Sequence, residues 1–278
     1  MPETTLYPPP RPLTVGEVLD LSFRIYQRTF VKCLVLGGLI VVVNWLPNLY
    51  SIVRGQTVMQ SVVKPNMDAG HVATVLIALL LAFVFPVALI LRQYHMVAGQ
   101  AVGGELLRAL ELLGRMVLII LLLFLMGAAC ALLLIPAFFA SGVWRYVLIA
   151  VLLLPMGYVF LRLACTLTAM AVENTGATGS IGRSWDLTGG NVLRLTAIYT
   201  VALFLLLVLY VAVGAATAFL SAVLGKGDVA LMAAAVGVMT VVAGALASPY
   251  YSALGLAVFG DLLVRKEGAD LSQRIRAA

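Results

Sequence analysis

Six long apolar segments constrain this chain more than any other feature of its sequence. They run approximately over residues 31–53, 72–91, 116–138, 146–172, 192–220 and 229–262. A bilayer core about 30 Å thick is crossed by roughly 20 helical residues, so each segment is long enough to span it. Apolar residues make up 63% of the 278 residues and charged residues only 11%, against about 45–50% and about 25% in soluble domains. The sequence therefore predicts an all-α integral membrane protein with six transmembrane helices.

The basic residues are distributed unevenly across the predicted membrane. With both chain ends in the cytoplasm, 14 of the 18 Lys and Arg residues lie on the cytoplasmic side, and the outer set is Arg54, Lys64, Arg145 and Lys226. Lys and Arg favour the cytoplasmic ends of membrane helices. The distribution therefore predicts cytoplasmic N- and C-termini. The net charge of +6 indicates contact with anionic lipid headgroups rather than with nucleic acid.

Short segments that mix charged and apolar residues precede the first, third and fifth apolar segments. They begin near Thr14, Gly104 and Ser180, and Thr14 with Glu17 forms the S/T-x-x-E pattern of a capping box. Helices with one charged and one apolar face lie in the membrane interface. We therefore expect three hairpins of two spans, each preceded by a cytoplasmic interfacial amphipathic helix.

The three units would cover approximately residues 14–100, 101–175 and 176–263. They would form a single membrane domain over residues 14–263, between a Pro-rich cytoplasmic tail at residues 1–13 and a basic cytoplasmic tail at residues 264–278. Because two spans return the chain to the same side, the units would be parallel repeats, which occur in some transporters. A parallel pseudo-threefold repeat is one possible arrangement, and unrelated helical hairpins are the other.

The sequence contains none of the residue groupings that common enzyme classes require. It has no Ser-His-Asp set and no HExxH, GxSxG or P-loop motif. The two histidines, His71 and His95, are predicted at opposite ends of the second span, and the three cysteines lack metal-ligand spacing. We therefore expect a protein that is not an enzyme, with no catalytic residues, no metal site and no cofactor.

The most distinctive polar residues are predicted on the cytoplasmic side. Asp261 and Arg265 are four residues apart and can pair on a helix. Glu173 or Asp186 can pair with Arg183 or with basic residues of another unit. Two interpretations are open: a salt-bridge layer that ties the helices together, or a site for a lipid phosphate or a protein partner. The candidates for binding lipid or a partner are Arg24, Arg28, Glu173, Arg183, Asp186, Asp261 and Arg265.

Polar and small residues within the predicted spans allow a further reading. Asn44 and Asn48 share a helix face near the outer end of the first span, beside Pro47. They could line an outer cavity, or they could form hydrogen bonds between helices and to the backbone that the proline frees. A stripe of small residues in the sixth span, including Gly244, would let another helix approach closely, within the bundle or in an oligomer.

The motifs on the cytoplasmic side together resemble a known family. They are the run from Val15 to Asp20, Glu173 followed by Arg183-Ser184-Trp185, and the run from Asp261 to Asp270. Their order over residues 13–271 resembles the membrane-domain family of glycerophosphoryl diester phosphodiesterases. The resemblance implies a bacterial six-span module without the catalytic barrel of the fused enzymes. Two positions depart from the family pattern: Gly260 stands where an aromatic residue is usual, and Leu263 where an arginine is usual.

Two functions are consistent with these features. The first is a non-enzymatic scaffold or accessory protein of the bacterial inner (cytoplasmic) membrane. Such a protein would engage lipid headgroups or a partner through its cytoplasmic charged layer, and the expected partners are anionic membrane lipids, a protein on the cytoplasmic side or a second copy of the chain. The alternative is a transporter or channel for a small solute or lipid, built from the three hairpins.

Overall fold

The computed structural model describes residues 6–56, 67–133, 135, 139, 141–224 and 229–277, and these residues form only helices and connecting loops. Within them, five helices are long and apolar enough to cross a membrane, and a sixth span results if α4 and α5, which are bent by 57°, count as one. The prediction of an all-α, multi-pass membrane protein is therefore confirmed. The helices are α1 (Val15–Val53), α3 (Ala69–Val97), α4 (Glu105–Glu111), α5 (Leu113–Leu133), α7 (Val143–Arg162), α8 (Thr166–Glu173), α9 (Ala177–Thr188), α10 (Val192–Leu224) and α11 (Val229–Ala277).

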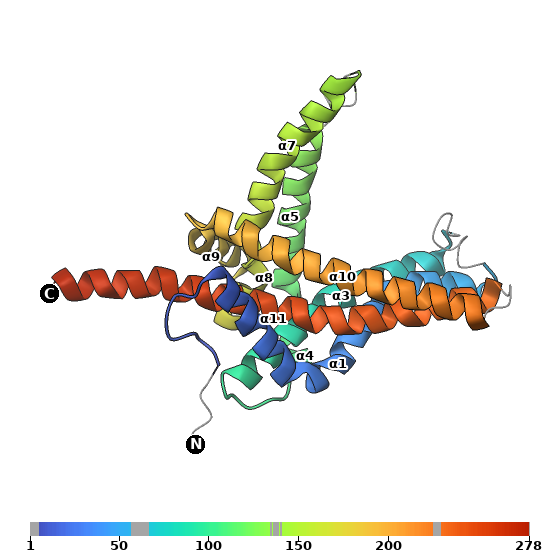
Figure 1. Ribbon diagram of the computed structural model, residues 1–278, viewed down its shortest axis with the longest axis horizontal. Helices are drawn as coiled ribbons and strands as arrows, with labels where there is room; N and C mark the ends of the chain where they lie inside the picture. Colours follow the sequence, from blue (N-terminus) through green and yellow to red (C-terminus); the bar gives the residue numbers. More distant parts are fainter. Residues whose placement is uncertain are drawn as a thin grey trace.

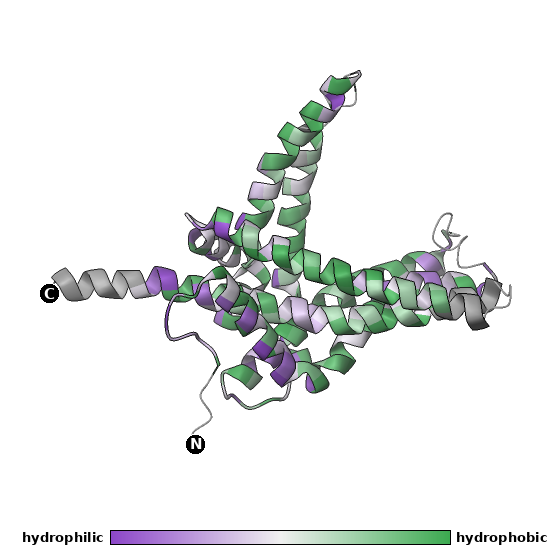
Figure 2. Cartoon of the chain, viewed as in Figure 1, coloured by the Kyte–Doolittle hydropathy of each residue, from purple (hydrophilic) through white to green (hydrophobic). Residues whose placement is uncertain are grey.

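Four of the long helices form the main body of the molecule. Helix α1 packs against α3 and α11, and α10 packs against α11, whereas α5 and α7 extend away from this group (Figure 1). The segment that leads into α1 and the C-terminal part of α11 lie at the same end of the group (Figure 1). Hydrophobic residues cover most of α5, α7 and α10, and hydrophilic residues gather near the start of α1 and on α9 (Figure 2). The equivalence of the three hairpins, and with it the pseudo-threefold repeat, stays a prediction.

The first interfacial segment and the first span are one continuous helix. The Thr14 hydroxyl accepts a hydrogen bond from the Glu17 N–H, and the Glu17 carboxylate accepts one from the Thr14 N–H, so the predicted capping box is confirmed. Helix α1 then runs without a break to Val53, and its one proline, Pro47, lies near its C-terminal end, so no proline separates the interfacial segment from the span. The expected separate helix before the first span is therefore wrong, whereas α4 and α9 are short helices that precede α5 and α10.

The predicted fourth span is interrupted after Arg162. Residues 163–165 form a tight turn between α7 and α8, in which the Leu163 N–H reaches the carbonyl of Phe160 and the Thr166 N–H that of Leu163. The Arg162 carbonyl instead accepts hydrogen bonds from the hydroxyls of Ser184 and Thr188 on α9. Helix α9 thus supplies the donors that a continuous helix would have supplied from its own backbone.

The two predicted tails are integrated with the helices. Helix α11 continues through the basic segment to Ala277, and the Pro-rich segment packs against the helical group. The Tyr7 ring is buried, contacts Tyr94 edge-on with centroids 5.5 Å apart, and lies over Gly260. Burial raises the pKa of the Tyr7 phenol. A Cβ atom at Gly260 would lie 2.7 Å from Tyr7 Cε2, so the missing aromatic at position 260 makes room for Tyr7.

Close packing between α1 and α11 depends on two glycines. A Cβ atom on Gly37 would lie 2.8 Å from the carbonyl oxygen of Ala245 and 3.0 Å from Cδ of Pro249. A Cβ atom on Gly244 would lie 2.3 Å from a methyl carbon of Val41. The small residue at Gly244 therefore serves helix packing within the molecule, as small residues commonly do between membrane helices.

Candidate functional site

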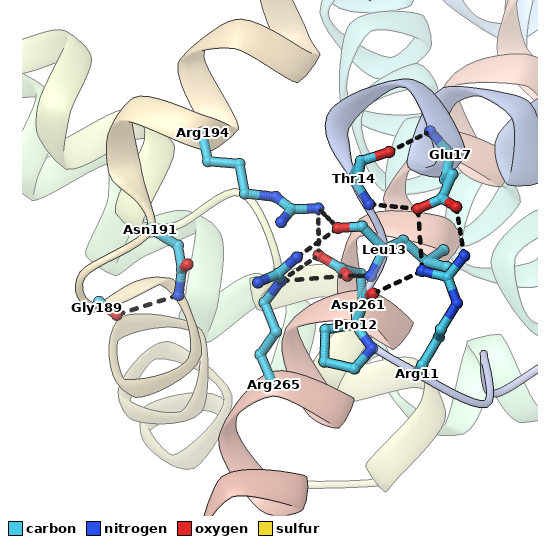
Figure 3. Close-up of polar contacts among 10 residues, drawn as sticks. All are labelled: Arg11, Pro12, Leu13, Thr14, Glu17, Gly189, Asn191, Arg194, Asp261 and Arg265. Atoms are coloured by element: carbon cyan, nitrogen blue, oxygen red, sulfur yellow. Dashed lines mark hydrogen bonds and ion pairs between the residues drawn. The ribbon is translucent and has the colours of Figure 1, made fainter.

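Asp261 is the centre of a buried polar cluster that joins three parts of the chain (Figure 3). Its residue is only 1% exposed. One carboxylate oxygen accepts a hydrogen bond of 2.7 Å from the Leu13 N–H, and the other lies 2.9 Å from Arg194 Nη2 and 3.1 Å from Arg265 Nε. The predicted pairing of Asp261 with Arg265 on one helix is confirmed. We call Leu13, Arg194, Asp261 and Arg265 the Asp261 cluster.

The same two arginines also hold the backbone just before α1. The guanidinium groups of Arg194 and Arg265 both donate to the Leu13 carbonyl (Figure 3). Both backbone groups of Leu13 are therefore bound by charged side chains from α10 and α11. Backbone groups beside a helix start need partners from outside the helix, and charge-assisted hydrogen bonds are the stronger kind. The cluster thus fixes where α1 begins relative to α10 and α11.

A second cluster joins α8, α9 and α11. Arg183 donates to both carboxylate oxygens of Glu173 over 2.9–3.1 Å, and its Nη2 lies 2.5 Å from a carboxylate oxygen of Glu267. The hydrogen bonds to Glu173 raise the pKa of the Arg183 guanidinium. Of the two pairings predicted for Arg183, the structure contains the one with Glu173. We call Glu173, Arg183 and Glu267 the Arg183 cluster.

The remaining candidates lie outside these clusters. Arg24 pairs with Asp20 over 2.8 Å on the exposed surface of α1, and Arg28 is exposed on the same helix. Asp186 is exposed on α9, and within the described residues the carboxylates paired with Arg183 belong to Glu173 and Glu267. The predicted residues therefore divide into members of the two clusters and a set of exposed charges.

The sequence did not indicate two of the important arginines. Arg194 follows a Gly-Gly-Asn turn at the start of a span and has no acidic residue at helical spacing, so only the packing of α10 on α11 brings it to Asp261. An arginine within an apolar segment commonly extends along its helix to the membrane interface. In the structure Arg162 is 8% exposed, with Cζ 4.3 Å from the centroid of the Trp185 ring. Its Nε is buried without a hydrogen-bond partner in the described part of the molecule.

The Asn44 side chain donates over 2.9 Å to the carbonyl of Ile40 on its own helix, and the outer cavity at Asn44 and Asn48 stays a prediction. A cavity of about 620 Å³ lies among α5, α7, α8, α10 and α11. Its walls are mostly apolar, with Met126, Phe160 and Leu203 among the lining residues, and they also include Tyr199.

The histidines lie in separate surroundings. His71, at the start of α3, is 3.1 Å from the Ser51 hydroxyl through Nδ1, whereas His95, near the end of α3, is 3.8 Å from a carboxylate oxygen of Glu105. No group of three or more His, Cys, Asp or Glu side chains that could hold a metal ion occurs among the residues that the structure describes.

The Arg183 cluster should contribute modestly to stability. We expect Glu173→Gln to destabilise the protein by about 1 kcal/mol, because it removes the charge from a bidentate pair that is partly exposed. Thermal unfolding in detergent measures the effect. Glu267→Gln is the matched variant, and it should cost less because the Glu267 side chain is 58% exposed while that of Glu173 is 23% exposed. An equal or larger loss for Glu267→Gln would contradict this ranking.

The comparison with known families concerns the half of the chain that carries most of these residues. Residues 133–274 match the family model described as the membrane domain of glycerophosphoryl diester phosphodiesterase. The matched range is just over half of the chain and includes Arg162 and the charged residues of both clusters. Comparisons with curated proteins and with solved structures gave no match. The chain belongs to the membrane-domain family of glycerophosphoryl diester phosphodiesterase.

Proposed function

We propose that this protein is a non-enzymatic scaffold or accessory protein of the bacterial inner membrane, with both termini in the cytoplasm. One observation carries the proposal: charged residues near the start of α1 are bound to one another in two clusters, and the Asp261 cluster also binds Leu13. Such a network produces a rigid charged face. We call this face, made of the two clusters with Asp20, Arg24, Arg28 and Asp186, the charged face.

The chemistry of the charged face supports binding rather than catalysis. The carboxylates of Asp261 and Glu173 already accept hydrogen bonds from arginines. A carboxylate that is held in such a structural ion pair is poorly placed to exchange a proton with a substrate. The exposed charges on α1 and α9 surround this fixed framework. They offer salt-sensitive contacts to anionic lipid headgroups or to a protein partner, and an enzyme held at the membrane is the kind of partner that the family description suggests.

The proposal predicts retention of a partner or of anionic lipid by the purified protein. Native mass spectrometry after extraction in mild detergent should detect a stoichiometric protein partner or bound anionic lipid. The double variant Arg24→Gln with Arg28→Gln should retain less of this partner or lipid, because the two substitutions remove exposed cations from the charged face. Arg54→Gln, an exposed arginine near the opposite end of α1, is the matched control and should retain the same amount. Wild-type protein that retains neither partner nor anionic lipid would refute the proposal.

Transport of a small polar solute receives no support from the cavity. Its mostly apolar walls would leave a polar solute without hydrogen bonds, and burying polar groups without partners is costly. Hydrocarbon fits such walls better, so among the transport alternatives the cavity favours a lipid.

A further inference from the structure

Arg162 differs from the three arginines of the two clusters. Arg183, Arg194 and Arg265 each pair with a carboxylate. No carboxylate of the described residues lies within 4.0 Å of the Arg162 guanidinium, although the residue is more than nine-tenths buried. A guanidinium stays charged at every physiological pH, so it cannot lower the cost of burial by losing a proton. A buried charge without a partner is strongly unfavourable, which indicates that an anion belongs beside it.

The surroundings of Arg162 hold its side chain in one place. Its own carbonyl is anchored to α9 by hydrogen bonds of 2.8 Å from the Ser184 hydroxyl and 3.2 Å from the Thr188 hydroxyl. The guanidinium lies against the rings of Trp185 and Tyr158, with Cζ 4.3 Å and 5.8 Å from the two centroids. Cation–π contacts stabilise the charge in part, but they leave Nε without a hydrogen-bond partner among the described residues.

The turn between α9 and α10 lies beside the same guanidinium. A Cβ atom added to Gly189 would be 3.0 Å from Arg162 Nη1, and Gly189 is three residues before Val192, the first residue of α10. The Asn191 side chain donates to the Gly189 carbonyl over 3.4 Å rather than accepting from the first N–H groups of α10. Gly189 is the C-cap of α9, and the positive end of the 33-residue helix α10 begins three residues later. Both this helix start and the unpaired guanidinium attract an anion.

We propose that Arg162 binds a phosphate group, and that this phosphate is carried by an anionic lipid of the cytoplasmic leaflet. Two N–H groups of a guanidinium match two phosphate oxygens, which makes arginine well suited to phosphate. The flanking rings of Trp185 and Tyr158 are 38% and 46% exposed, as is typical of aromatic side chains at the headgroup level of a membrane. The inference rests on the proposed function, because it names one contact through which the protein would engage lipid headgroups.

Lipid binding to defined nanodiscs tests the proposal. Wild-type protein should unfold at a higher temperature in nanodiscs that contain phosphatidylglycerol than in nanodiscs of phosphatidylcholine alone, and native mass spectrometry should find phosphatidylglycerol bound. Arg162→Gln should lose this gain and bind phosphatidylglycerol about tenfold more weakly or worse, because it removes a charge-assisted contact. Arg162→Lys keeps the positive charge and should show an intermediate loss, so it decides the question if the Gln variant fails to fold. Arg108→Gln, an exposed arginine on α4, should behave like wild type.

A second arm distinguishes the source of the phosphate. Inorganic phosphate is titrated into wild-type protein in phosphatidylcholine nanodiscs. No stabilisation assigns the site to a lipid headgroup, whereas Arg162-dependent stabilisation would assign it to free phosphate and overturn the lipid assignment. Equal lipid binding by wild type and Arg162→Gln would overturn the whole inference while leaving the proposed function intact. Conversely, Arg162-dependent binding in nanodiscs by a protein that retains neither lipid nor partner from its own membrane would refute the proposed function alone.

Discussion

Replacing Asp261 by Asn should destabilise the protein by about 3 kcal/mol. The amide oxygen of the new side chain could still accept from the Leu13 N–H, but the negative charge that Arg194 and Arg265 share would be gone. Removing one member of a buried ion pair leaves its partners uncompensated and typically costs about 3–5 kcal/mol. We place the effect at the lower end because the Arg194 and Arg265 side chains are 18% and 28% exposed. Thermal unfolding in detergent, followed by circular dichroism, measures the loss.

Asp20→Asn provides the matched control for this variant. Asp20 also pairs with an arginine four residues away on its own helix, but both side chains of that pair are more than half exposed. Exposed pairs contribute about 0–1 kcal/mol, so Asp20→Asn should change the unfolding temperature little. If Asp261→Asn unfolds at the same temperature as Asp20→Asn, then the buried cluster does not stabilise the fold.

Replacing Gly37 by Ala should cost about 1–3 kcal/mol, the usual cost of an extra methyl group in a tightly packed contact. The added Cβ would meet the Ala245 carbonyl oxygen at 2.8 Å and the Pro249 ring at 3.0 Å. Neither group is the flexible end of a side chain, so α1 and α11 would have to move apart. The measurement is again the unfolding temperature in detergent.

Gly38→Ala separates this packing effect from helix propensity. Both substitutions favour helix by up to about 1 kcal/mol, but a Cβ on Gly38 would make only an ordinary contact, 3.9 Å from the Ala245 Cβ. Gly38→Ala should therefore be neutral or stabilising. Equal unfolding temperatures for the two variants would show that α1 and α11 are not held as closely as the structure has them.

Whether a contact could be predicted from the sequence depends on how far apart its two residues lie along the chain. The capping box at Thr14 and the pair Asp261–Arg265 each lie within one helical turn, where spacing alone determines proximity. The pair Glu173–Arg183 was predicted as one of two alternatives, because ten residues of turn and helix separate its members. The long apolar segments likewise indicate membrane helices without reference to any neighbour.

The remaining features depend on contacts between distant parts of the chain. Arg194 meets Asp261 only because α10 packs against α11. Arg162 is buried because α9 folds back over the end of α7 and brings Trp185 to its guanidinium. Tyr7 fills the space above Gly260, although the two residues lie near opposite ends of the sequence. Neither hydrophobic periodicity nor motif spacing contains the register of one helix on another, so these contacts could not be predicted.

A double-mutant cycle on Asp261 and Arg194 tests most directly whether the residues of the charged face hold one another. Asp261→Asn, Arg194→Gln and the double variant are compared with wild type by thermal unfolding. Because the two side chains are 2.9 Å apart, the double variant should be less destabilised than the sum of the single variants by about 1–3 kcal/mol. Additive losses, within about 0.5 kcal/mol, would contradict a mutually bound charged face and remove the observation on which the proposed function rests.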